Sequence, residues 1–171
     1  MFVFSGMAEE MVHIVDDQDN VIDTVPRSEM RAKKLRHRVV RVFLFNSKDE
    51  IFIHQRTYEK DLYPGYFDTS IAGAVTTKTY EEEAVRELEE EVGIANVPIQ
   101  SLFKFNSTVT QSFCMVYKCV YDGKLKLQKE EVISGKFMSI DEVKELIKKE
   151  KFHPSGVKAF EIYLRDHHKR D

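Results

Sequence analysis

The stretch YEEEAVRELEEEVGI, residues 80–94, decides how this chain of 171 residues folds. Seven of the eleven residues from 81 to 91 are glutamates. With about 100° of helical rotation per residue, four carboxylates share one arc of roughly 100°, and four apolar residues form a stripe beside it. The four carboxylates belong to Glu83, Glu87, Glu90 and Glu91, and the apolar stripe consists of Ala84, Val85, Leu88 and Val92. Gly93 is the residue type that commonly ends a helix. The stretch therefore predicts a helix with an acidic face next to its core-facing stripe.

The acidic face has two interpretations. Like charges three or four residues apart repel each other, so the acidic face destabilises its helix unless a cation neutralises it. Carboxylate oxygens are ligands that suit Mg²⁺, Mn²⁺ or Ca²⁺. A solvated acidic surface is the alternative, and it describes Glu82 and Glu89, which point away from the arc. Composition alone leaves both interpretations open for the arc, while Arg86 at its margin can orient Glu83 or Glu90 by a charge-assisted hydrogen bond.

Outward from this helix, runs of alternating and β-branched residues predict strands on both sides of it in the chain. The expected strands are a pair within 11–24, then 39–46, 50–56, 66–75, 102–105, 112–122 and 123–128. Two further helices are expected over about 140–150, opened by a capping box of Ser139 and Glu142, and over about 155–168. One helix between groups of strands, followed by helices, predicts an α+β fold.

Composition and charge narrow the class of protein. Hydrophobic residues make up 42% and charged residues 32%, and the formal net charge is −3, so no overall basic field favours nucleic acid. No apolar run reaches the roughly 18 residues that span a bilayer. The two cysteines, Cys114 and Cys119, are an odd number of residues apart in an expected strand and so lie on opposite faces. We expect a cytoplasmic protein with an extension at residues 1–10, one domain over 11–171, and neither a nucleic-acid nor a membrane partner.

The segment Arg86–Ile94 reads RELEEEVGI and resembles the second half of the Nudix box, R-E-U-x-E-E-x-G-U, where U is aliphatic. Further segments resemble one branch of that family, which joins nucleotide-type hydrolases to isopentenyl-diphosphate isomerase. They are LRHR at 35–38, HQRT at 54–57, YPGYFD at 63–68 and QKEEV at 128–132. The resemblance covers about residues 11–160. It implies an α/β/α sandwich with a mixed central sheet and a loop-helix-loop metal site.

The first half of the box departs from the family pattern, G-x5-E-x7-R. Counting back from Arg86 puts Lys78 at the glutamate and Ala72 at the glycine, as if one residue were deleted near TTKT, residues 76–79. The resemblance therefore leaves open whether this loop reduces activity.

Site residues follow from the resemblance, residue by residue. Glu87, Glu90 and Glu91 would bind Mg²⁺, with Mn²⁺ as a possible substitute, and Arg86 would orient one of them. Glu90, Arg86 and Glu131 form the expected catalytic set. Glu131 is the preferred general base and Glu130 the second choice, with a solvated strand edge as the equal alternative. Two basic residues, Arg56 and Lys60, match substrate-binding positions of the branch. His37 matches a metal-ligating histidine of the isomerase, but here we favour a structural role for it.

The implied activity is Mg²⁺-dependent hydrolysis of a diphosphate linkage in a nucleoside diphosphate derivative or a similar phosphorylated metabolite. Metal-activated water would attack one phosphorus. A noncatalytic Nudix-fold binding module is the alternative. Isopentenyl-diphosphate isomerase is a weaker one, because Ala72-Gly73-Ala74 stands where the isomerase has its cysteine and histidine. A small-molecule diphosphate is the expected partner, and the sequence does not distinguish a monomer from a homodimer.

Overall fold

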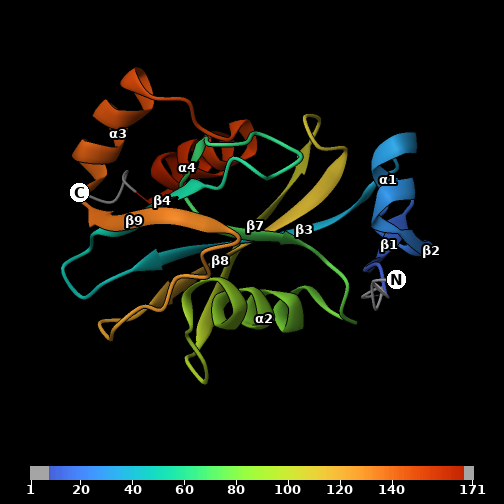
Figure 1. The fold of residues 1–171 in the computed structure, drawn as a ribbon, viewed down its shortest axis with the longest axis horizontal. Helices are drawn as coiled ribbons and strands as arrows, with labels where there is room; N and C mark the ends of the chain where they lie inside the picture. The colour runs from blue at the N-terminus through green and yellow to red at the C-terminus, as the bar shows by residue number, and fades with distance from the viewer. Residues whose placement is uncertain (1–7, 168–171) are drawn as a thin grey trace, which may run out of the picture.

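The computed structural model describes residues 8–167, so most of the expected extension at residues 1–10 lies outside the described residues. Figure 1 shows a sheet with helices on both of its faces. The described elements, in chain order, are β1 (Met11–Val15), β2 (Val21–Pro26), α1 (Arg27–Lys33), β3 (His37–Phe45), β4 (Ile51–Arg56), β5 (Phe67–Asp68), β6 (Ile71–Ala74), α2 (Tyr80–Val92), β7 (Ile99–Ser107), β8 (Ser112–Val120), β9 (Val132–Met138), α3 (Ile140–Lys149) and α4 (Pro154–His167).

Strand β3 organises the sheet. It pairs in parallel with β8 along its whole length, from His37 opposite Ser112 to Phe45 opposite Val120. Its pairings with β1, β4 and β6 are antiparallel, as are β7 with β8 and β9 with β4. The predicted α+β fold with a mixed sheet is therefore confirmed.

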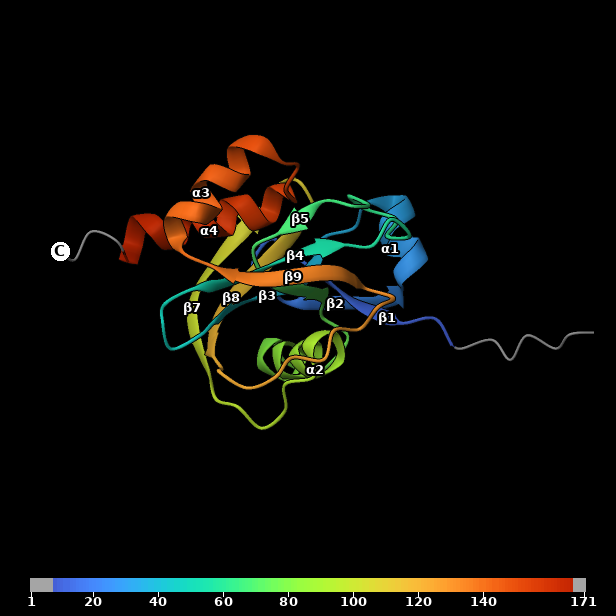
Figure 2. The same cartoon turned by 60° about the vertical axis from the view of Figure 1, so that its left-hand side comes forward.

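The two faces of β3 carry two separate cores. Val40, Val42 and Leu44 pack with α2, whereas Phe43 and Phe45 pack with α3 and α4. This alternation follows from the two-residue period of a strand. Ala84, Leu88 and Val92 of the predicted apolar stripe are in the core on the α2 side, but Val85 is exposed. Figure 2 shows the resulting layers, with α2 on one side of the sheet and α3 and α4 on the other. The opposite placement of the two cysteines is confirmed, since they belong to different cores.

Two of the strands predicted from the sequence, 66–75 and 123–128, are wrong. The segment 66–75 forms two strands, because β5 pairs with β4 while β6 pairs with β3. The segment 123–128 forms no strand: the N–H groups of Lys126 and Gln128 donate to the carbonyls of Val92 and Glu91, at 2.9 Å each. Its alternating leucines do pack on the α2 core, but its backbone satisfies the C-terminal carbonyls of a helix rather than a neighbouring strand.

Candidate active site

The acidic helix α2 begins and ends where the sequence predicts. The side chain of Thr79 accepts a hydrogen bond from the N–H of Glu82 at 3.1 Å, which caps the first turn. Gly93 follows the last turn with a φ of 73°, in the left-handed region that favours glycine. These two residues fix the length of α2 and the position of its acidic face.

Glu83 holds the loop that precedes α2. Its side chain is fully buried, and its Oε2 accepts hydrogen bonds from the N–H groups of Thr76 and Thr77 at 2.9 and 3.0 Å. Arg86 donates to its Oε1 at 2.7 Å. Burial opposes the charge of Glu83, but these donors outweigh burial and lower the pKa of the carboxyl group. Glu83 therefore supports the loop at which the sequence departs from the Nudix pattern.

Glu87 and Glu91 form a buried acidic pair, with exposed fractions of 8% and 6%. Glu87 lies against Gly73 of β6, where a Cβ atom would be 2.1 Å from its Oε1. Burial, followed by repulsion from Glu91 and Glu83, raises the pKa of Glu87. Burial also raises the pKa of Glu91, against the opposing effect of Lys60. The surrounding side chains therefore do not offset the cost of ionising both carboxyl groups.

Arg86 lies between the carboxylates of α2. Its Nη1 donates to Oε1 of Glu90 at 3.2 Å, and its Nη2 lies 3.8 Å from Oε1 of Glu87. The Glu90 side chain is 49% exposed. Arg86 thus contacts Glu83 and Glu90, the two carboxylates that the helical spacing places beside it, and it also lies close to Glu87 of the buried pair.

The three remaining predicted site residues lie near the acidic pair. Lys60 forms an ion pair with Glu131, and the charges of Lys60 and Arg56 both act on Glu91. Arg56, at the end of β4, donates its guanidinium hydrogens to two carbonyl oxygens of the loop that follows. The structure therefore brings residues from β4, the next loop and the start of β9 to the side of α2 that carries Glu91. Glu130 contributes its backbone carbonyl to Thr57, and its side chain is exposed.

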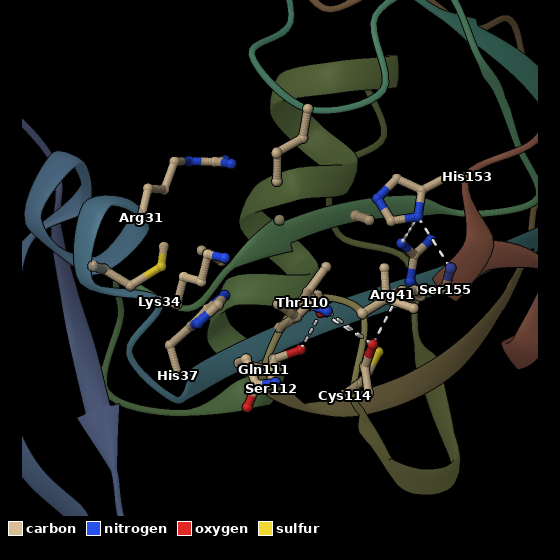
Figure 3. Close-up of a pocket in the computed structure, with 18 of the residues that line it drawn as sticks. Arg31, Lys34, His37, Arg41, Thr110, Gln111, Ser112, Cys114, His153 and Ser155 are labelled. Atoms are coloured by element: carbon tan, nitrogen blue, oxygen red, sulfur yellow. Dashed lines mark hydrogen bonds between the residues drawn. The ribbon is translucent and has the colours of Figure 1, made fainter.

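A cavity of about 400 Å³ opens beside Gly73, between α1, β3 and the turn from β7 to β8. Figure 3 shows its two ends, with Arg31 and Lys34 on one side and Arg41 and His153 on the other. Every charged side chain among its described lining residues is basic. These side chains are Arg27, Arg31, Lys34, Arg41, Arg56 and Lys60. The cavity is therefore suited to an anionic ligand.

One wall of this cavity contains a buried polar network that was not predicted from the sequence. Arg41 Nη1 donates to Asp68 Oδ1 and Ser70 Oγ at 2.9 Å each. Arg41 Nη2 and the N–H of Ser155 each lie 3.2 Å from Nδ1 of His153, so Nδ1 accepts and Nε2 carries the ring proton. Burial would raise the pKa of Asp68, but Arg41 outweighs burial and the pKa falls to about 2. The sequence feature that could have indicated this network is Arg41, a charged residue within the apolar run VVRVFLF, residues 39–45.

The predicted metal ligands are only partly assembled. Among residues 8–167, no three side chains of His, Cys, Asp or Glu converge in an arrangement ready to hold a metal ion. Glu87 and Glu91 nevertheless suit a hard divalent cation, because their donors are carboxylate oxygens and the neighbouring side chains do not offset the cost of ionising them. Glu90, the third predicted ligand, is engaged by Arg86.

Comparison with known proteins identifies the family of this chain. The family model of the NUDIX domain matches residues 35–160, which include the acidic helix and the cavity residues from Leu35 onward. The chain belongs to the Nudix family. It is 34% identical over 158 residues to the uncharacterized Nudix hydrolase PA4841 of Pseudomonas aeruginosa, covering 91% of this chain and 94% of that one. It is 31% identical over 165 residues to the uncharacterized Nudix hydrolase YfcD of Escherichia coli K12, covering 95% of this chain and 91% of YfcD.

Solved Nudix structures share the fold. The crystal structure of DR0079 from Deinococcus radiodurans superposes with a TM-score of 0.79 at 26% identity, covering 89% of this chain and 98% of that one. The NUDIX domain of Shewanella oneidensis NrtR, solved with ADP ribose, has a TM-score of 0.59 at 16% identity. The match covers 80% of this chain and 96% of the NrtR domain. That second likeness concerns the fold alone.

Family membership establishes the general activity. The Nudix domain and the relatives named as Nudix hydrolases make this chain a Nudix-type pyrophosphohydrolase, of a family that generally uses divalent metal ions. Within residues 8–167, each helix is too short or too polar to span a lipid bilayer.

Proposed function

We propose that this Nudix enzyme hydrolyses a diphosphate linkage in a nucleoside diphosphate derivative or a similar phosphorylated metabolite, with Mg²⁺ as its cofactor and Mn²⁺ as a substitute. The observation that carries the proposal is the position of the buried acidic pair, Glu87 and Glu91, beside a cavity whose charged side chains are all basic. The acidic pair suits a cation and the basic cavity suits a phosphate-rich ligand, so together they suit a metal-bound diphosphate.

Each residue has a proposed part in this reaction. Glu87 and Glu91 would hold the cation with Glu90 as the third ligand, and Arg86 would orient Glu90 through the hydrogen bond that it already makes. A bound divalent cation would neutralise the diphosphate and acidify a water molecule. Arg56 and Lys60 would bind the phosphate oxygens. Glu131, held by Lys60, would accept the proton of the attacking water as the bond between phosphorus and the bridging oxygen breaks.

We also propose that the chain falls in the branch similar to isopentenyl-diphosphate isomerase but does not isomerise. Ala72 and Ala74 both line the cavity, and they stand where the isomerase has a cysteine and a histidine. A methyl group can neither donate nor accept the proton that isomerisation moves. Hydrolysis needs neither group, so the same cavity supports it.

Three broader expectations belong to this proposal. Residues 11–171 act as one unit, the enzyme works in the cytoplasm, and it is a monomer or a homodimer whose partner is a small-molecule diphosphate. The basic cavity supports the last point, because its volume of about 400 Å³ falls within the range typical of small-molecule sites.

The test is release of phosphate and monophosphates from nucleoside diphosphates, sugar nucleotides, dinucleotides and isopentenyl diphosphate, each with Mg²⁺, with Mn²⁺ or with a chelator. Metal-dependent release that falls at least 100-fold in Glu91→Gln would support the proposal. The matched control is Glu89→Gln, which removes an exposed carboxylate from the same helix and leaves release unchanged. Tight Mn²⁺ binding without release from any substrate would instead support the binding module.

A further inference from the structure

Four of the six cations that line the cavity fall into two groups, which come from different segments of the chain. The first group is Arg56 and Lys60, whose charges act on Glu91 of the acidic pair. The second group is Arg31 of α1 and Lys34, the residue that follows α1, and Figure 3 shows both at the end of the cavity away from Arg41 and His153. In the proposed hydrolysis, the first group binds the diphosphate that is cleaved. The second group has no part in the hydrolysis proposed above.

The charge of this second group is poorly neutralised. Arg31 makes one ion pair, at 3.0 Å to Asp61, whose side chain is 61% exposed to solvent. Among the described residues, Lys34 makes no ion pair within 4 Å. Burial, followed by repulsion from Arg27, lowers the pKa of Arg31, with a further contribution from Arg56. Cations that repel each other across a cavity are stabilised by an anion placed between them.

The rest of the lining offers little for a planar base. Among the described lining residues there is no Phe, Tyr or Trp side chain on which a base could stack. The turn from β7 to β8 contributes hydroxyl and amide groups instead, from Ser107, Thr108, Thr110, Gln111 and Ser112. Such groups form hydrogen bonds with phosphate or polyol oxygens. The turn therefore adds hydrogen-bonding groups to the cations of the cavity.

We propose that this end of the cavity, formed by Arg31 of α1 and Lys34 directly after it, binds a second phosphate group of the substrate, in addition to the diphosphate that is cleaved. The inference rests on the proposed function, because it places the scissile diphosphate at Arg56, Lys60 and the acidic pair. The substrate class is then a diphosphate compound that also carries a phosphomonoester. A phosphomonoester dianion takes several charge-assisted hydrogen bonds from a guanidinium and an ammonium group, which a neutral hydroxyl group cannot match.

The test uses substrates that differ by one phosphate. The first pair is nicotinamide adenine dinucleotide with and without its 2′-phosphate, and the second is phosphoribosyl diphosphate against ribose 1-diphosphate, neither of which has an aromatic ring. We expect the phosphomonoester member of each pair to have a kcat/KM at least tenfold higher. In Arg31→Gln/Lys34→Gln this ratio falls to about one, because only the phosphomonoester member is affected. Lys33→Gln is the matched control, since Lys33 is exposed on the same helix, pairs with Glu29 and does not line the cavity.

The two proposals can fail separately. Calorimetric binding of the same pairs, with and without Ca²⁺, reports the second-phosphate site even in a protein that releases no product. Preferential binding of the phosphomonoester members that the double variant abolishes supports the site, whether or not hydrolysis occurs. Equal binding within a pair, or a preference that survives in Arg31→Gln/Lys34→Gln, overturns it while leaving hydrolysis to be judged by product release.

Discussion

The carboxylate of Glu87 occupies the space into which a side chain at Gly73 would project, because a Cβ atom there would lie 2.1 Å from Oε1 of Glu87. The nearest atoms also include Cδ and Cγ of Glu87, at 2.4 and 3.0 Å. Strand β6 and helix α2 therefore meet at the acidic pair with no intervening side chain. This contact couples the loop before α2 to the site, and it makes the glycine a requirement of the geometry.

The first prediction concerns Gly73→Ala. The added methyl group must displace the Glu87 carboxylate, so we expect metal-dependent release to fall at least tenfold while the protein stays folded. Steady-state kinetics and urea unfolding measure the two effects. Gly123→Ala is the control, since its methyl group meets the ring end of the Tyr121 side chain and no carboxylate of the site. Unchanged kinetics in Gly73→Ala would show that the carboxylate position is not critical.

The second prediction concerns the metal-free protein. The pKa of Glu87 is higher in the folded than in the unfolded protein, so this group stabilises the fold below its unfolded pKa and costs stability as the pH rises above that value. At pH 7.5 with a chelator, Glu87→Gln should therefore raise the free energy of unfolding by at least about 1 kcal/mol. Chemical denaturation measures this change, with Glu89→Gln expected to have no effect.

Adding the metal ion should reverse the order of stability, so that wild type becomes more stable than Glu87→Gln. Mg²⁺ or Mn²⁺ that binds only the folded protein stabilises wild type by an amount that rises with the logarithm of the metal concentration above the Kd. We expect Glu87→Gln to lose most of this stabilisation. An equal metal-dependent shift of the melting temperature in both proteins would place the cation elsewhere.

The third prediction concerns the ion pair between Arg41 and Asp68, in which the side chains are 3% and 1% exposed. Asp68→Asn leaves the arginine charge uncompensated inside the protein, which costs about 3–5 kcal/mol of unfolding free energy. Urea denaturation at pH 7 measures the loss. Asp141→Asn removes a carboxylate that is 93% exposed, and its effect should stay within about 1 kcal/mol. A similar small effect at Asp68 would contradict the importance of the buried pair.

The fourth prediction concerns acid stability. Burial lowers the pKa of His54 to about 4, from an ordinary value of 6.5. The folded protein then binds fewer protons than the unfolded chain between these values, so His54 contributes stability above pH 6.5 that is lost as the pH falls toward 4. The loss amounts to roughly 3 kcal/mol. Denaturation curves between pH 4 and 7 should show a shallower pH slope in His54→Gln, whereas replacing the exposed His167 should leave the slope as it is.

Local patterns were sufficient for α2, α3 and α4, but they left α1 unassigned. The period of residues 80–92, the cap at Thr79 and the stop at Gly93 all act within one or two helical turns, so the sequence alone predicts α2. The capping box of Ser139 and Glu142 is present for the same reason. The Nudix motif also lies within one contiguous segment, which is why the family and its pyrophosphohydrolase activity could be predicted before the fold was known.

Only the tertiary structure decided which carboxylates are buried and what faces them. Helical spacing places Glu87, Glu90 and Glu91 on one arc, but the packing of β6 against α2 buries Glu87 and Glu91 and leaves Glu90 half exposed beside Arg86. The parallel pairing of β3 with β8, the split of residues 66–75 and the cationic cavity all depend on contacts between distant segments. Side chains far apart in the chain have no periodic relation to each other, so the sequence alone determined the elements and the family, whereas the fold decided the charge balance of the site.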